Sequence, residues 1–344
     1  MSLTIKEIKD QYNALMQTSA LLADEKDTLA SYFAKEKPAS ITFLGCGSSY
    51  SLAKSMQFIT STQMGIRSYA LAGGDLWLNV DRYKEMLKGT MIVTISRSGS
   101  TSEILNAIEA LRKFQEVKVI SIACVKDSAL AKLSDVTLEM PWAFDESVCQ
   151  TRTVSCMYAA GAMMIAAFAK NDKLTEDLNH VINHGDYYIS KNEESYKAVA
   201  KLPWDSIVVL ADGEIEGLAE EGSLAFKEIS QLQSNYYHIL DSRHGPMVLI
   251  GEKTLVIVAL TSDNKYEQSL VSDLLKKGAT IVTTSQLPSK IDGVYHNAAC
   301  EFAVDHIAAG LLCLNACQLI SYYKALEVGT DPDAPDGLDA WIKI

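Results

Sequence analysis

The sequence has no Cys-x-x-Cys pair, no apolar run of the roughly 20 residues that span a bilayer, and no excess of basic charge. Its seven cysteines lie mostly in apolar runs, which predicts free thiols in a reducing cytoplasm and neither a disulfide framework nor a structural zinc site. With 31 Lys and Arg against 43 Asp and Glu, the net charge is −12. Because nucleic-acid binding needs clustered cations, we expect no nucleic-acid partner. Because no apolar run is long enough to span a bilayer, we expect no membrane partner either.

Two common nucleotide-binding motifs are also missing. Gly45-x-Gly47 lacks the third glycine of a dinucleotide fingerprint, and no Gly-Lys-Ser/Thr follows, as a Walker A loop would require. The histidines other than His244 show no metal-like spacing with carboxylates. We therefore expect no metal and no organic cofactor.

The residues that are present predict a duplicated α/β fold. Short β-branched runs alternate with longer helical patterns, which is typical of a mostly parallel sheet. Runs at 41–44, 91–96, 119–124 and 136–140 are followed by counterparts at 207–211, 255–260, 280–284 and 302–304. The first three pairs are offset by 161 to 166 residues, and a tandem duplication explains such similar offsets.

The predicted organisation has five parts. They are an N-terminal helical segment (1–37), a first α/β domain (38–170), a helical connector (171–203), a second α/β domain (204–328) and a C-terminal tail (329–344). Prolines at 38 and 203 mark the ends of the two helical parts, since proline cannot continue a helix.

Two turns that follow predicted strands of the first half consist largely of glycine and hydroxyl residues. One covers 45–49 and the other covers 96–101. Each places small residues at a helix N-terminus, where free amides and the helix dipole favour an anion such as phosphate. Ordinary capping by Ser and Thr is the alternative for each turn taken alone.

Acid/base candidates appear in the second half. Glu221, Leu224 and Glu228 share one face of a predicted helix. A carboxylate beside an apolar residue on a partly buried face is a candidate base, and a solvated acidic face is the alternative. Sixteen residues after Glu228, the loop at 242–246 presents His244, either as a proton shuttle or as a surface residue.

Five motifs in this order resemble the tandem sugar isomerase (SIS) family. They are GCGSSYS at 45, SRSGSTSE at 96, ESVCQTRT at 146, EEGSLAFKEIS at 220 with RHGP at 243, and GTDPDAP at 329. The family includes the isomerase half of glucosamine-6-phosphate synthase, amino-sugar-phosphate deaminase/isomerases and fructosamine-6-phosphate (Amadori) deglycases. The resemblance implies two flavodoxin-like αβα units and a sugar phosphate as the substrate.

The resemblance also implies a role for each motif. Phosphate is expected at Ser48, Ser49, Ser96, Arg97, Ser98 and Thr101, and the sugar at Gly47, Val148 and Gln150. Arg97 stands where the synthases often have glutamine. Glu228 is implied as the base that moves a proton between C1 and C2, and His244 as the acid/base that opens the sugar ring. Because the HGP loop often reaches the neighbouring subunit's site in this family, a homodimer with shared sites is implied.

Two departures distinguish the subfamilies. The lysine that synthases and deaminases commonly carry three residues before the catalytic glutamate is Ala225 here, and the stretch 336–340 lacks the tail lysine of the synthases. Both absences resemble the Amadori deglycases, so we expect an enzyme acting at C1/C2 of a 6-phosphorylated ketosamine or amino sugar. Without a glutaminase domain, glutamine-dependent synthesis is not expected. An amino-sugar-phosphate isomerase or deaminase and a non-catalytic phosphosugar-binding regulator are the alternatives.

Overall fold

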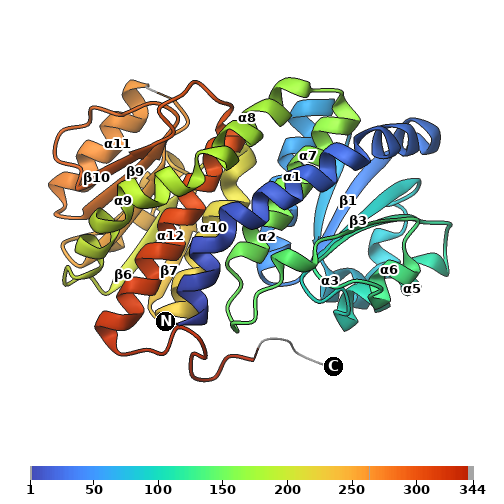
Figure 1. Cartoon of the computed structure of the whole chain (residues 1–344), viewed down its shortest axis with the longest axis horizontal. Coiled ribbons are helices and arrows are strands. Elements are labelled where there is room, and N and C mark those ends of the chain that lie inside the picture. The colour runs from blue at the N-terminus through green and yellow to red at the C-terminus, as the bar shows by residue number, and fades with distance from the viewer. Residues whose placement is uncertain (1, 263, 340–344) are drawn as a thin grey trace. The chain divides into compact units, whose positions relative to one another are not determined.

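The computed structural model describes residues 2–262 and 264–339, which form two compact units (Figure 1). The second-repeat unit comprises residues 2–12, 146–151 and 177–338, and the first-repeat unit comprises 13–145 and 152–176. Each unit contains a parallel five-stranded sheet. The predicted α/β architecture, with two αβα units, is confirmed.

In the first-repeat unit the strands follow the flavodoxin-like order β2-β1-β3-β4-β5. Its elements are most of α1 (Leu3–Glu36), β1 (Ser40–Gly45), α2 (Ser48–Met64), β2 (Ser68–Ala72), α3 (Gly73–Leu78), α4 (Val80–Tyr83), β3 (Thr90–Ser96), α5 (Ser102–Arg112), β4 (Lys118–Ala123), α6 (Ala129–Leu133), β5 (Val136–Glu139), the 3-10 turn η1 (Pro141–Ala143) and α7 (Arg152–Ala169). Ile104 and Ile108 of α5 share a core cluster with Leu44 and Ile92 of the sheet. Helix α2 packs on β1 and on α7, so helices cover the sheet as its buried parallel strands require.

The second-repeat unit repeats this order as β7-β6-β8-β9-β10. Its elements are the start of α1, most of α8 (Asp172–Asn183), α9 (Gly185–Ala200), β6 (Ser206–Leu210), η2 (Gly213–Ile215), α10 (Glu216–Ile229), β7 (Gln233–Tyr237), η3 (Asp241–Arg243), η4 (Pro246–Leu249), β8 (Thr254–Ala259), α11 (Lys265–Lys276), β9 (Thr280–Ser285), β10 (His296–Ala299) and α12 (His306–Val328). Leu270 and Leu274 of α11 join the core with Val208 and Val256, whereas α10 and α12 pack on each other and on the sheet.

The structure corrects two sequence-based expectations in this unit. The run at 302–304 is not the fifth strand, which is β10, at His296–Ala299. The helical pattern that carries Glu221 and Glu228 extends over 218–233 in the sequence, but the helix ends at Ile229, because Gln231 adopts a left-handed backbone (φ 53°) and the chain then enters β7. A left-handed residue cannot continue a right-handed helix.

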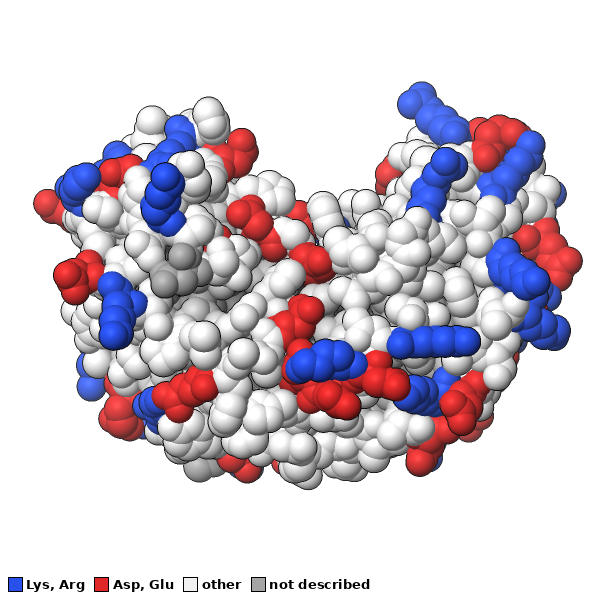
Figure 2. Space-filling model, turned by 90° about the horizontal axis from the view of Figure 1, so that it is seen from above, with Lys and Arg blue, Asp and Glu red and all other residues white. Residues whose placement is uncertain are grey.

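One described helix, α7, is long and apolar enough by length and composition to cross a membrane. Most of that helix, 89% of it, is buried inside the structure, as in the core helices of globular proteins. On the face shown in Figure 2, Lys and Arg side chains are interspersed with Asp and Glu.

Helix α9 packs closely on α1 where Gly185 meets the Tyr12 ring. A Cβ atom on Gly185 would lie 1.9 Å from the buried Tyr12 ring, so Gly185→Ala is expected to lower the free energy of unfolding by about 1–3 kcal/mol through overpacking. Urea denaturation measures this change. For the matched control, Gly251→Ala, the nearest atom to the added Cβ is 3.8 Å away, and we expect a change within about 1 kcal/mol. Equal effects of the two substitutions would contradict the packing argument.

Candidate functional site

The turn after β1 is built around glycines. Gly47 precedes α2 with a positive φ of 54°, and a Cβ on Gly45 would lie 2.3 Å from the Ser49 carbonyl oxygen. Ser48 and Ser49 are buried in the first turn of α2, and among the described residues no side chain caps that helix. The N-terminus of α2 therefore lacks a side-chain cap, while the amides of Ser49 and Tyr50 donate to the Cys46 and Gly47 carbonyls. A helix N-terminus without a side-chain cap favours an anion through the helix dipole.

The turn after β3 lies at the same edge of the sheet, because Leu44 of β1 is paired with Thr94 of β3. The Ser96 hydroxyl lies 2.9 Å from the Thr101 hydroxyl and accepts a hydrogen bond from the Gly99 amide. Ser98 accepts the Ser100 amide. The structure thus brings the predicted phosphate-binding hydroxyls to one sheet edge, and their role in binding stays a prediction.

Arg97 is buried in this turn. Its guanidinium lies over the Phe144 ring, 5.8 Å from the ring centroid, and its backbone carbonyl accepts the Cys124 amide. In the turn after β1, burial raises the pKa of the Cys46 thiol, and the Glu103 carboxylate raises it further. Cys46 is therefore a thiol rather than a thiolate near neutral pH.

At the equivalent edge of the second-repeat unit, side chains of the unit itself bond to the loop and helix amides. The Asn264 side chain caps α11 by accepting the Tyr266 and Glu267 amides, and the buried Glu267 carboxylate accepts the amide and the hydroxyl of Thr261. These groups already use the donors that an anion would need, and Glu267 adds a like charge.

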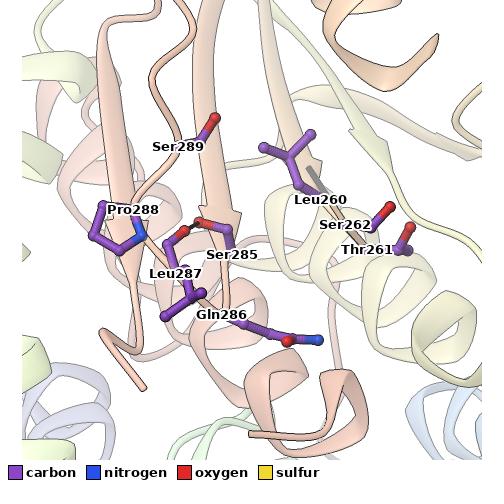
Figure 3. A pocket seen from close by; sticks show the side chains of 8 residues that line it. All are labelled: Leu260, Thr261, Ser262, Ser285, Gln286, Leu287, Pro288 and Ser289. Atoms are coloured by element: carbon purple, nitrogen blue, oxygen red, sulfur yellow. Dashed lines mark hydrogen bonds between the residues drawn. The ribbon is translucent and has the colours of Figure 1, made fainter. Parts of the chain in front are cut away.

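A cavity of about 230 Å³ lies at that edge, between the loops that follow β8 and β9 (Figure 3). Its lining residues are Leu260, Thr261, Ser262, Ser285, Gln286, Leu287, Pro288 and Ser289. No basic side chain is among them, so phosphate binding is expected at the first-repeat edge and not here.

The segment 146–151, which carries the predicted sugar-binding residues Val148 and Gln150, belongs to the second-repeat unit. Cys149 packs against Ala225 and Ile229 of α10, which lie three residues before and one residue after Glu228. The Gln150 side-chain oxygen is buried and accepts no hydrogen bond from the described residues. An unsatisfied buried acceptor is costly, which favours a bound ligand as its donor.

Glu228 is half-buried on α10, the helix that packs closely on α12. A Cβ on Gly222 would lie 2.6 Å from the Cys317 sulfur, and the Ser321 hydroxyl donates to the Ala225 carbonyl. Glu221 is buried, so the face shared by Glu221, Leu224 and Glu228 is not a solvated acidic face. The structure thus brings Glu228 together with the segment that carries Val148 and Gln150.

His244 lies in an exposed loop between η3 and η4, where Gly245 has φ 133°. The preceding Arg243 fixes this loop to α11 by pairing with Asp273 at 2.7 Å. Val248 and Leu249 are 78% and 81% exposed, so a single chain leaves the histidine and two large apolar side chains in solvent.

Two other histidines lie within hydrogen-bonding distance of carboxylates at the strand ends of this unit. His306 lies 2.7 Å from Glu214, and this hydrogen bond raises the histidine's pKa. His238 lies 2.9 Å from Asp212. No cluster of three His, Cys, Asp or Glu residues suited to a metal occurs in the described part of the chain.

Sequence reasoning missed three polar residues that hold the segment 146–151. They are Glu7 at the start of α1, Gln318 on α12 and Asp333 in the tail. Glu7 had a local signal, because this acid lies between the apolar residues Ile5 and Ile8 of a helix, and Asp333 lies within the GTDPDAP motif at 329, although the sequence assigned it no role.

Comparisons with known proteins agree with the fold described above. A model of the SIS domain matches residues 32–167 and 202–326. The chain is 27% identical over 355 residues to a glutamine–fructose-6-phosphate aminotransferase (isomerizing) from Pyrobaculum aerophilum, covering 99% of this chain and 57% of that protein. The chain thus spans little more than half the length of this curated relative.

Solved structures match the whole chain. A glucosamine-6-phosphate deaminase from Thermotoga maritima is 26% identical, with a TM-score of 0.83 and coverage of 100% of both chains. A tagatose-6-phosphate ketose/aldose isomerase from Escherichia coli shares the fold at 22% identity, with a TM-score of 0.86 and coverage of 98% of this chain and 96% of that one. Since the SIS model matches both repeats and most of the chain, the protein belongs to the SIS domain family.

Proposed function

We propose that this chain is a cytoplasmic enzyme that acts at C1 and C2 of a 6-phosphorylated ketosamine, as a fructosamine-6-phosphate deglycase. One observation carries this proposal. Glu228 lies on α10 beside the segment with Val148 and Gln150, and the position one turn before it is a buried alanine, Ala225, packed on Cys149. An amine at that position would be buried in an apolar contact.

The proposed chemistry follows from these groups. His244 moves a proton between the anomeric hydroxyl and the ring oxygen, which opens the ring. The Glu228 carboxylate removes the proton at C1 while the C2 carbonyl oxygen takes up a proton from solvent, which gives an enaminol. Glu228 then returns its proton at C2, which leaves a protonated imine at C1. Addition of water to the imine releases an aldose 6-phosphate and the free amine, so no cofactor is required.

The phosphate of the substrate is assigned to the first-repeat turns. The helices α2 and α5 that follow these turns have no side-chain cap. In the second repeat, by contrast, Asn264 and Glu267 accept hydrogen bonds from backbone amides of the corresponding region. A glucosamine-6-phosphate deaminase or isomerase is the second candidate, because the Thermotoga maritima deaminase matches over the whole chain.

The first test is turnover followed by mass spectrometry, with fructose-amino-acid 6-phosphates, glucosamine 6-phosphate and fructose 6-phosphate as substrates. We expect amine release from the first group, with Glu228→Gln reducing kcat about 10²- to 10⁴-fold, since a general base is lost. Glu220→Gln, which removes another carboxylate from α10, is the control and is expected to retain activity. Turnover of glucosamine 6-phosphate or fructose 6-phosphate alone would replace the deglycase by the deaminase or isomerase. Tight binding without turnover would indicate a regulator.

The phosphate assignment has its own test. The double variant Ser96→Ala/Thr101→Val is expected to weaken binding of fructose 6-phosphate by about tenfold or more, because hydrogen bonds to a charged group are lost. Isothermal titration calorimetry measures the affinity. Ser262→Ala, in the corresponding turn of the second repeat, is the matched control and is expected to bind normally. An equal loss in both variants would contradict the assignment.

We also propose a homodimer in which the loop that carries His244 contacts the neighbouring subunit. The exposed Val248 and Leu249 support this, since adjacent large apolar side chains in solvent mark contact surfaces. Leu249→Lys is expected to convert the dimer to a monomer in sedimentation velocity. Leu78→Lys changes a similarly exposed leucine elsewhere and is expected to leave the dimer intact. A monomeric wild-type chain would refute this part of the proposal.

A further inference from the structure

The start of α1 places a buried carboxylate against the backbone of the segment 146–151. Glu7 is buried, with only 4% of its surface exposed. Its Oε1 accepts the Glu146 amide at 2.6 Å and the Ser147 amide at 3.3 Å, and its Oε2 accepts the Ser147 hydroxyl. Burial of a carboxylate is unfavourable unless its oxygens are hydrogen-bonded, so these contacts are needed for Glu7 to occupy this place.

The C-terminal tail fixes the same end of α1. The carboxylate of Asp333 accepts the amides of Leu3 and Thr4 at 2.9 and 2.8 Å and the hydroxyls of Ser2 and Thr4 at 2.6 and 2.8 Å. It thereby caps a helix that begins about 330 residues earlier in the chain. Although burial raises the pKa of Asp333, these hydrogen bonds lower it below its usual value, so the cap is charged near neutral pH.

The tail also contacts the segment directly. The Val148 amide donates to the Asp333 carbonyl at 3.3 Å. At the other end of the segment, the Gln318 side chain donates to the Thr151 carbonyl at 2.9 Å and accepts a hydrogen bond from Gln11 of α1. Backbone groups from 146 to 151 are therefore held by α1, the tail and α12, while Cys149 packs on α10.

We propose that Glu7 and Asp333 are positioning residues that set where Val148 and Gln150 lie relative to Glu228. Neither is expected to touch the reacting atoms. Their contacts fix the backbone of the segment, and that backbone carries the two side chains assigned to the sugar. This inference rests on the proposed function for its effect on catalysis, whereas the clamp itself, formed by Glu7, Asp333 and the segment 146–151, can be tested without a substrate.

The substrate-free test is hydrogen–deuterium exchange of the peptide that contains residues 146–151. In Glu7→Gln and in Asp333→Asn, its amides are expected to exchange at least about tenfold faster, since a charge-assisted hydrogen bond is weakened. Peptides of α2 and α5 should exchange as in wild type. Asp24→Asn, which changes an exposed acid of α1, is the control. Unchanged exchange in both clamp variants would overturn the proposal.

The functional test compares two ligands. In the clamp variants the KM for the sugar 6-phosphate is expected to rise about tenfold, because the segment binds the sugar less tightly. The kcat is expected to stay within about threefold of wild type. Affinity for inorganic phosphate should not change, because the phosphate turns belong to the other unit. Faster exchange without a change in KM would refute the positioning role, whereas faster exchange in an enzyme with no turnover of any sugar phosphate would refute only the proposed function.

Ser147→Ala covers the case in which Glu7→Gln fails to fold, because it removes one hydroxyl partner and leaves the carboxylate with its two amides. By itself, Ser147→Ala is expected to speed exchange of the 146–151 peptide and to raise KM, in the same direction as Glu7→Gln. Where Glu7→Gln folds, a double-mutant cycle between the two is expected to be non-additive in exchange rate and in KM. Additive effects would show that the two side chains act independently, which contradicts the clamp.

Discussion

Both sheets are wholly parallel, and most of the structure depends on the constraints that parallel pairing imposes. Consecutive parallel strands must be joined by a crossover, so each strand ends at the same edge and a helix begins there. The pairing of β1 with β3 brings two glycine and serine turns to one edge of the sheet. In the same way, the pairing of β6 with β8 brings the residues 211–215 and 260–262 to one edge of the other sheet. Open α/β sheets bind their ligands at such edges.

The two repeats share strand order but have diverged at these edges. In the first repeat, glycines and hydroxyls leave helix amides uncapped at α2 and α5. In the second repeat, Asn264 caps α11, and Glu267, His238 and His306 are engaged in hydrogen bonds with neighbouring residues. The two repeats thus differ at the same edge of the fold. The edge of the first repeat has helix N-termini without side-chain caps, which suits an anion, whereas polar groups at the edge of the second repeat already bond to neighbouring residues.

The compact units do not follow the order of the chain. The segment 146–151 follows the last strand of the first repeat in sequence, yet it packs with α10, α12 and the start of α1. This exchange places the residues assigned to the sugar beside Glu228. It also gives the N-terminal helix and the C-terminal tail a structural connection to the candidate site, through Glu7 and Asp333.

Local pattern predicted the elements that are buried on both faces. Strands β1, β3 and β8 are buried along their whole length, and their apolar runs stand out in the sequence. The pattern predicts the outer strand β5 as well, but not the outer strands β2, β7 and β10, which are partly exposed and carry polar residues such as those of QSNYY. The apolar run at 302–304 does not form a strand, and it is not buried as a whole, since Phe302 is 41% exposed and only Val304 of the run is buried. A short apolar run by itself therefore does not identify a strand.

The sequence by itself determined the fold class, the duplication and, through its motifs, the candidate residues from Gly47 to His244. Those inferences rest on residues that are close together in the chain, where spacing and composition carry the signal. Only the tertiary structure decided which residues hold the segment 146–151, because Glu7 and Asp333 lie 139 and 185 residues from the amides at 146 and 148 that they bind. Hydrogen bonds between such distant residues leave no periodic pattern, so folding alone brings them together.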